Sequence, residues 1–242
     1  MTRALPGQDT LIACWNALAE TSAGAQVHQS PRAVVATFPS WLPLNNAVVL
    51  DGDPATPSVV APEVARVYAD AGVDVWALWV PSWAVSFDDP DRVLEIAGLE
   101  RDTTTLVMQS VLSPRLHAHD EVVEASLAAI VRLANEEPVP ARELGAPETT
   151  PGLSAWALVV DGVAVVGAWT FLHRQDCGIY AVGTLPAFRR RGLARTLMEH
   201  VLGNARRRGA RTASLQSTRM GQPLYESLGF TPVGRYEEWI RG

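Results

Sequence analysis

A short turn rich in arginine and glycine limits what this chain can fold into more than any other stretch. The turn, Arg189 to Gly192, follows a candidate strand at Ile179–Val182, and apolar residues then recur at helical spacing from Leu193 to Ala205. The first N–H groups of a helix have no internal partner, and the helix dipole favours negative charge beside them. Glycine leaves that backbone open, and arginine donates to phosphate oxygens. The sequence therefore predicts a strand–turn–helix unit that binds a diphosphate.

The spacing of this turn differs from that of a P-loop and from the dinucleotide fingerprint G-x-G-x-x-G. It is R-x-x-G-x-A, formed by Arg189, Gly192 and Ala194, after the preceding Val182-x-Thr184-x-Pro186-x-Phe188. With Tyr225-Glu226-Ser227-Leu228-Gly229-Phe230 downstream, these residues resemble the acetyl-CoA-binding motif of the GNAT superfamily of N-acetyltransferases. The resemblance covers Leu153 to Trp239. The alternative is a helix start rich in solvated arginine.

The resemblance implies a cofactor site with acetyl-CoA as cosubstrate. Backbone groups around Val182 and Thr184 would bind the pantetheine arm like an added strand, and N–H groups from Arg190 to Arg195 would hold the pyrophosphate. A backbone N–H near Val182 would polarise the thioester carbonyl. The residues expected to bind cofactor are Val182, Gly183, Thr184, Arg189, Arg190, Arg191, Gly192, Leu193, Ala194 and Arg195. Ordinary strand packing of Val182 and Thr184 is the alternative.

Tyr225 is the catalytic residue that the resemblance implies. In the family's Tyr-x-x-x-Gly-Phe pattern the tyrosine protonates the CoA thiolate, and here Tyr225 precedes Gly229 by four residues. A tyrosine packed at a helix start is the alternative. The general base stays open, because Gly178–Thr184 carries no carboxylate. Nearby titratable side chains are those of His173, Asp176, Cys177 and Tyr180, and a water chain or an amine that arrives neutral would also serve.

The composition indicates a globular protein and argues against a nucleic-acid surface. The 242 residues are 48% hydrophobic and 19% charged, with no lysine and a net charge of −6. The segment from Arg189 to Arg211 carries +7, so the remainder carries −13. A local positive patch on an acidic chain fits a small polyanion better than a duplex. Two cysteines give neither a disulfide framework nor a metal site.

The expected elements alternate between helices and strands. A helix around Leu11–Leu18, strands at 33–38 and 47–50, a helix at 62–71, a strand at 73–80, a short helix at 91–97 and a strand at 103–107 form the first half. A helix at 121–134, an Asp161-Gly162 hairpin, the strand and helix around the arginine turn, a strand at 212–217, a short helix at 224–228 and a strand at 233–240 form the second. The tryptophans read mainly as core residues, with an aromatic wall for an acceptor as the alternative.

The two halves repeat one order of elements, punctuated by Gly72 in the first and Gly209 in the second. We therefore expect an α+β fold of two GNAT-like units, each a mixed, mostly antiparallel twisted sheet with flanking helices. Residues 1–112 would form a degenerate unit without the cofactor motif, since Asp51 and Asp53 would repel a pyrophosphate. Residues 113–242 would form the catalytic, acetyl-CoA-binding domain. Coincidence of ordinary α/β punctuation is the alternative.

The sequence thus favours an N-acetyltransferase that acts on a primary amine of a small molecule or a protein. The alternative is a non-catalytic acyl-CoA-binding sensor module, which the missing carboxylate favours and Tyr225 disfavours. We expect no nucleic-acid or membrane partner, and no apolar run approaches the roughly 20 residues of a membrane span. No signal-peptide pattern opens the chain, so the expectation is a cytoplasmic monomer or homodimer.

Overall fold

The computed structural model describes residues 4–87, 98–113 and 119–241, and the expected helix at 91–97 lies outside them. The chain divides into two compact units. Unit 1 comprises residues 1–108, 216–222 and 232–242, and unit 2 comprises residues 109–215 and 223–231. The predicted boundary was a single cut between residues 112 and 113, whereas the two units interleave because the end of the chain joins unit 1. The functional division of the two halves stays a prediction.

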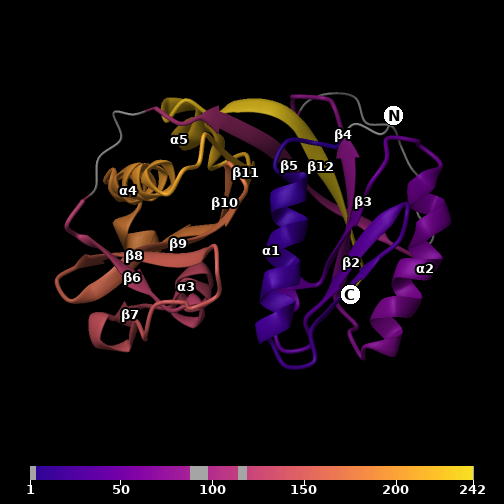
Figure 1. Ribbon diagram of the computed structural model, residues 1–242, viewed down its shortest axis with the longest axis horizontal. Helices are drawn as coiled ribbons and strands as arrows, with labels where there is room; N and C mark the ends of the chain where they lie inside the picture. Colours follow the sequence, from indigo (N-terminus) through magenta and orange to yellow (C-terminus); the bar gives the residue numbers. More distant parts are fainter. Residues whose placement is uncertain (1–3, 88–97, 114–118, 242) are drawn as a thin grey trace. The chain divides into compact units, whose positions relative to one another are not determined.

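Unit 1 is a mixed, mostly antiparallel sheet with a helix on each face (Figure 1). Its strands lie in the order β1 (Gln26–Gln29), β2 (Ala33–Thr37), β3 (Asn46–Val49), β4 (Trp76–Ser82), β12 (Thr231–Arg241) and β5 (Glu100–Val111). The pair β3–β4 is parallel, and β1–β2, β2–β3 and β4–β12 are antiparallel. The final strand of the chain therefore lies beside β4, with Trp239 opposite Leu78.

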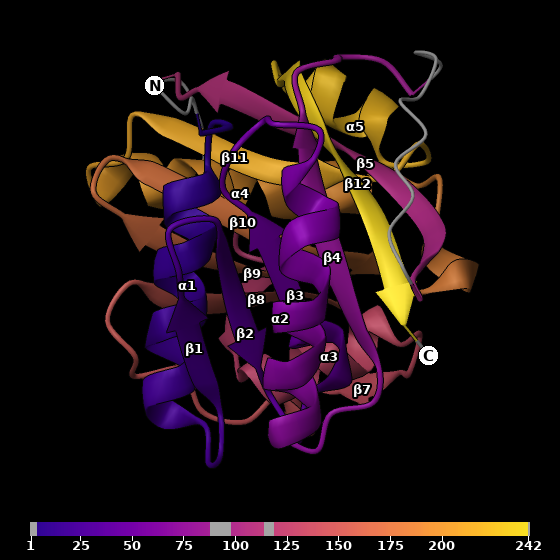
Figure 2. The same cartoon turned by 90° about the vertical axis from the view of Figure 1, so that its right-hand side faces the viewer.

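Helix α2 (Thr56–Asp70) crosses β2, β3 and β4 on one face of this sheet, as Figure 2 shows, and α1 (Gln8–Thr21) covers the other. The apolar residues of α2 form a buried cluster with residues of the sheet. Within this cluster, Tyr68 of α2 stacks on Trp76 of β4, with ring centroids 4.8 Å apart. The predicted start of this helix at Pro62 is wrong, because Pro62 lies inside α2. Pro57 occupies the first turn instead, where a missing N–H removes no helical hydrogen bond.

Unit 2 also has a mixed, mostly antiparallel sheet, in the order β11 (Thr212–Ser217), β10 (Asp176–Thr184), β9 (Val163–His173), β8 (Leu153–Val160) and β6 (Val122–Ala125). Among these five described strands, the β10–β11 pair is parallel and the others are antiparallel, and the short strand β7 (Val139–Pro140) pairs with β9. Helix α3 (Leu127–Ala134) and helix α4 (Leu193–Arg207) lie on opposite faces (Figure 1). The hairpin β8–β9 turns at Asp161-Gly162 as predicted. The α+β class and the sheet type are confirmed in each unit.

The predicted helix at 121–134 is wrong in its first part, which forms β6. The β-branched Val122 and Val123 pair with β8 and complete its edge. The helix begins only after Ser126, whose hydroxyl accepts a hydrogen bond from Ala129 N at 3.3 Å. The carboxylate of Glu148 accepts from Leu127 N at 2.6 Å. Two side chains therefore cap this helix, and one of them is remote in sequence.

The tryptophans mostly pack in the core, as predicted: Trp15, Trp76, Trp156, Trp169 and Trp239 are buried. Trp83 differs, since it is 39% exposed.

No helix among the described residues is both long enough and apolar enough to cross a bilayer.

Glu238 on β12 is a partly buried acid in unit 1 that the sequence did not indicate. Burial raises the pKa of its carboxyl to about 7, although the Thr105 hydroxyl donates to Oε1 at 3.3 Å. Because the pKa of Glu238 is higher in the folded state than in the unfolded chain, the folded state binds more protons between about pH 4.5 and 7. The free energy of unfolding should therefore fall as pH rises through this window.

We expect Glu238→Gln to stabilise the protein at pH 8 by roughly 1–3 kcal/mol, because the amide needs no desolvation of a charge. At pH 4.5, where Glu238 is protonated, the same variant should differ little from the wild type. Urea unfolding at the two pH values measures both free energies. Equal effects at pH 4.5 and pH 8 would show that the Glu238 carboxyl does not titrate in this window.

Candidate functional site

Strand β10 of unit 2 changes its pairing midway, where the predicted cofactor strand begins. Its register with β9 shifts between Tyr180 and Gly183, and Ala181 takes a φ of 50°. Its parallel pairing with β11 runs from Asp176 and ends at Ile179. Such a bulge bends the strand and interrupts its ladder. On the β11 side, the described structure gives Val182–Thr184 no strand partner, which leaves this side to an extended ligand, although Thr184 O accepts from Arg189 Nε at 3.1 Å.

The arginine turn connects this strand to α4. A short 3-10 turn, η3 (Pro186–Phe188), comes first, and Gly192 is the N-cap of α4 with a φ of 81°. No side chain caps the helix, and Thr196 N, bonded to Gly192 O at 3.2 Å, makes the first helical hydrogen bond. The N–H groups of Leu193, Ala194 and Arg195 are therefore without intrahelical acceptors. A Cβ at position 192 would meet nothing within 4 Å, so open space lies beside this helix start.

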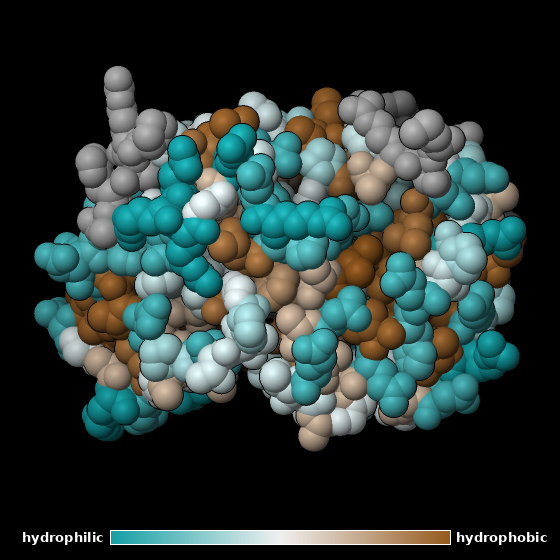
Figure 3. Space-filling model, viewed as in Figure 1, coloured by the Kyte–Doolittle hydropathy of each residue, from teal (hydrophilic) through white to brown (hydrophobic). Residues whose placement is uncertain are grey.

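The four arginines predicted to bind cofactor divide into two kinds. The guanidinium of Arg189 donates to Thr184 O at 3.1 Å and pairs with Glu136, just after α3. That of Arg195 contacts Glu199 and Ser227 O, both at 3.0 Å. Arg190 and Arg191 are exposed, and Arg191 lies over the Phe188 ring at 5.1 Å. Hydrophilic side chains gather over α4 on the face drawn in Figure 3.

The helix α5 (Gln222–Ser227) carries Tyr225, which is 7% exposed and packs its ring edge-on against Phe230, with ring centroids 6.0 Å apart. Burial raises the pKa of Tyr225 to about 12. Transfer of its proton to a thiolate, whose acid has a pKa of about 8.5, would therefore be uphill by roughly 5 kcal/mol. This hydroxyl is better suited to donate a hydrogen bond than to give up its proton.

The four titratable side chains near the cofactor strand are poorly placed or poorly suited to act as the general base. Both carboxylate oxygens of Asp176 accept hydrogen bonds at 2.7 Å, from the hydroxyls of Thr212 and Ser214. Burial raises the pKa of the Cys177 thiol to about 12. His173 is the last residue of β9 and pairs with Asp176, at the opposite end of β10 from Val182–Thr184. The Tyr180 ring packs at a tilt against Trp169, with ring centroids 4.5 Å apart. The identity of the base stays open.

The corresponding turn of unit 1, between β3 and α2, is closed by its own carboxylates. Asp51 Oδ1 accepts from Asp53 N at 3.0 Å, and Asp53 Oδ1 accepts from Ala55 N at 3.0 Å. N–H groups that would otherwise face an anion are thus satisfied by fixed negative charges. This geometry favours the absence of a cofactor site in unit 1, which stays a prediction.

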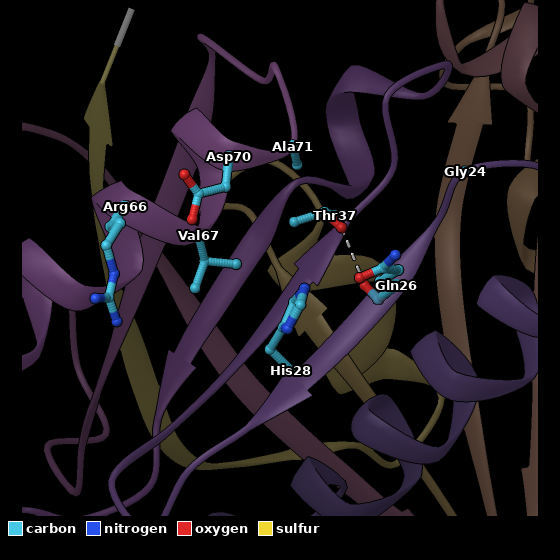
Figure 4. Close-up of a pocket in the computed structure, with 8 residues that line it drawn as sticks. All are labelled: Gly24, Gln26, His28, Thr37, Arg66, Val67, Asp70 and Ala71. Atoms are coloured by element: carbon cyan, nitrogen blue, oxygen red, sulfur yellow. Dashed lines mark hydrogen bonds between the residues drawn. The ribbon is translucent and has the colours of Figure 1, made fainter.

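A separate hollow of about 340 Å³ lies in unit 1 between α2 and the edge strand β1. Figure 4 shows Arg66 and Asp70 on the helix and His28 on the strand, with the Thr37 hydroxyl donating to Gln26 O at 3.3 Å. It contains none of the predicted site residues, and no sequence pattern indicated it because the residues that line it come from two separate segments of the chain.

The comparisons with known proteins agree with this geometry. Residues 124–230 match the family model described as the acetyltransferase (GNAT) family. A search of curated proteins finds no match. Among solved structures, a GCN5-related N-acetyltransferase from Kribbella flavida is 16% identical, with a TM-score of 0.64 over 98% of this chain and 96% of that one. A GNAT-family putative acetyltransferase from Novosphingobium aromaticivorans is 19% identical, with a TM-score of 0.59 over 89% and 90%. At these identities the two structures show the fold alone.

Proposed function

We propose that this chain transfers an acetyl group from acetyl-CoA to a primary amine, because residues 124–230 match the acetyltransferase (GNAT) family model. The observation that carries the proposal is that unit 2 combines two features: β10 stops pairing with β11 after Ile179, and the N-terminus of α4 has no side-chain cap. Together they offer backbone donors for an extended arm and for a diphosphate.

The residues present fit acetyl-CoA, which when bound supplies an activated acetyl group and a thiolate leaving group. Backbone groups of Val182, Gly183 and Thr184 would hold its pantetheine arm. The N–H groups of Gly192 to Arg195 would bind its diphosphate, with Arg190 and Arg191 adding charge from outside. Arg189 would act indirectly, since its bonds to Thr184 O and Glu136 fix the turn.

Tyr225 would donate a hydrogen bond to the departing sulfur. Its low exposure strengthens such a bond, because little water competes for the hydroxyl. The acceptor amine would lose its proton to water or arrive neutral, since Asp176 is committed to Thr212 and Ser214.

Thiol release in the presence of acetyl-CoA and a panel of primary amines, both small molecules and peptides, tests this function. We expect turnover with at least one amine and none in its absence beyond slow hydrolysis. The lack of a carboxylate base on the second half of β10 favours one competitor, a non-catalytic acyl-CoA sensor. Tight cofactor binding without turnover on any amine would favour that reading over the enzyme.

The oligomeric state, location and partners of the protein are also part of what we propose. We propose a cytoplasmic monomer or homodimer that acts on an amine of a small molecule or a protein, without a nucleic-acid or membrane partner. Sedimentation velocity of the full chain measures the oligomeric state. A stable higher oligomer would contradict this part of the proposal.

A further inference from the structure

We propose that Arg195 is a positioning residue that couples the diphosphate-binding turn to Tyr225. Arg195 is the third residue of α4, so its backbone N–H belongs to the open helix start. Its side chain bridges the carboxylate of Glu199 and the carbonyl oxygen of Ser227. One residue thus takes part in both halves of the proposed site. The inference rests on the proposed function for what the coupling achieves.

The guanidinium of Arg195 is committed to the protein. Nη1 donates to Glu199 Oε1 at 3.0 Å, one turn further along α4, and Nη2 donates to Ser227 O at 3.0 Å. Both bonds are charge-assisted, and the planar fork directs them in two fixed directions. Glu199 is the sole acidic residue between Arg189 and Arg211 in the sequence, and it is also 3.4 Å from the ring of His119. Although the Arg195 side chain is 43% exposed, these two bonds hold its guanidinium in one orientation, which suits a positioning role better than that of a mobile phosphate ligand.

The bond to Ser227 fixes a helix that cannot stabilise itself. Helix α5 has six residues, far fewer than an isolated helix needs in water. Its C-terminal end is closed by Phe230 N, which donates to Tyr225 O at 3.0 Å, and by the Arg195 bond to the Ser227 carbonyl. Tyr225 and Ser227 are two residues apart, so a shift of one displaces the other. The position of the Tyr225 hydroxyl therefore depends on the side chain of Arg195.

The coupling has a direct functional consequence. A diphosphate on the N–H groups of α4 would order the first turn of that helix, including Arg195. The same residue then holds α5, so cofactor binding and placement of the Tyr225 hydroxyl are linked through one side chain. Since errors of about 1 Å in placement can cost a hundredfold in rate, loosening this link should slow turnover more than it weakens binding.

Arg195→Lys is the informative variant, because lysine keeps the charge but cannot reach both partners with one fork. We expect kcat to fall about ten- to a hundredfold, while the Kd for acetyl-CoA changes less than about threefold. In the Tyr225→Phe background the same substitution should cost less than about threefold, because the hydroxyl that it positions is already gone. Arg206→Lys, at the exposed far end of α4, is the matched control and should change neither value.

Two kinetic outcomes would overturn the inference. Equal factors for the loss of kcat/KM and of cofactor affinity would make Arg195 a phosphate ligand. Full additivity of Arg195→Lys and Tyr225→Phe would show that Arg195 does not act through the tyrosine.

A readout without turnover separates this inference from the proposed function. The chain has four tyrosines, so fluorotyrosine labelling gives four ¹⁹F signals, and Tyr225→Phe identifies one of them. Arg195→Lys should shift the Tyr225 signal and leave the others in place, whereas Arg206→Lys should shift none. An unmoved Tyr225 signal would refute the coupling even in an active enzyme. Silence of the wild type on all amines would refute the function alone.

Discussion

Gly192→Glu abolishes the rise in melting temperature that acetyl-CoA gives the wild-type chain; this is the first result we expect. In the wild type, cofactor at a hundred times its Kd stabilises the folded state by about 2.7 kcal/mol, roughly 5–11 °C for a domain of this size. Glutamate at position 192 places a negative charge where the diphosphate would bind, and its Cβ strains a backbone with a φ of 81°. Differential scanning fluorimetry with and without cofactor measures the shift.

Gly209→Glu is the matched control for this experiment. Gly209 follows the other end of α4, is exposed, and has a φ of 98°, so glutamate there adds the same charge and a comparable strain. Gly209→Glu should lower stability about as much as Gly192→Glu does, but the shift caused by acetyl-CoA should persist. A full shift in Gly192→Glu would place the diphosphate elsewhere and remove the basis of the proposed site.

Tyr225→Phe should lower kcat by about a hundredfold and leave the Kd for acetyl-CoA within about twofold. The hydroxyl would contact the sulfur only as charge develops there, so its loss affects the rate rather than binding. The ring contact with Phe230 remains, which keeps the fold. Stopped-flow detection of thiol release and isothermal titration of the cofactor measure the two quantities.

The wild-type pH profile offers a second check on Tyr225. Because burial raises its pKa to about 12, the hydroxyl keeps its proton throughout the ordinary range, and no loss of rate near pH 10 should arise from its ionisation. Tyr68→Phe is the control for the Tyr225→Phe variant, because it removes another buried hydroxyl, which donates to Ala36 O in unit 1. This control should lower stability without changing kcat. Wild-type turnover in Tyr225→Phe would clear this tyrosine of a catalytic role.

Periodicity predicted most elements because it reflects burial along a single element. The apolar spacing after Leu193 gave α4, and Asp161-Gly162 gave the β8–β9 hairpin. The same reasoning failed at Val122–Ala125, where an apolar run read as helix forms an edge strand. Periodicity cannot separate short buried strands from helices, and the partner strand β8 decided the outcome.

In the candidate site too, sequence patterns predicted the local features but not the contacts between residues that are distant in the chain. The R-x-x-G-x-A spacing located the turn and the open helix start, and the separate Tyr-x-x-x-Gly-Phe pattern located Tyr225; each pattern is local in the chain. It did not reveal that the guanidinium groups of Arg189 and Arg195 are held by Glu136 and Ser227. A hint existed for Arg195, since Glu199 lies four residues later on the same helix.

The sequence by itself determined the R-x-x-G-x-A turn, the mixed α+β character of each unit and the placement of charge around α4. Each of these depends on residues that are close together in the chain. Tertiary structure alone decided where β10 stops pairing with β11, which arginines remain exposed, and that the last strand lies beside β4. Strand pairing and ion pairing select among many distant partners by fit and burial, and no local pattern encodes that selection.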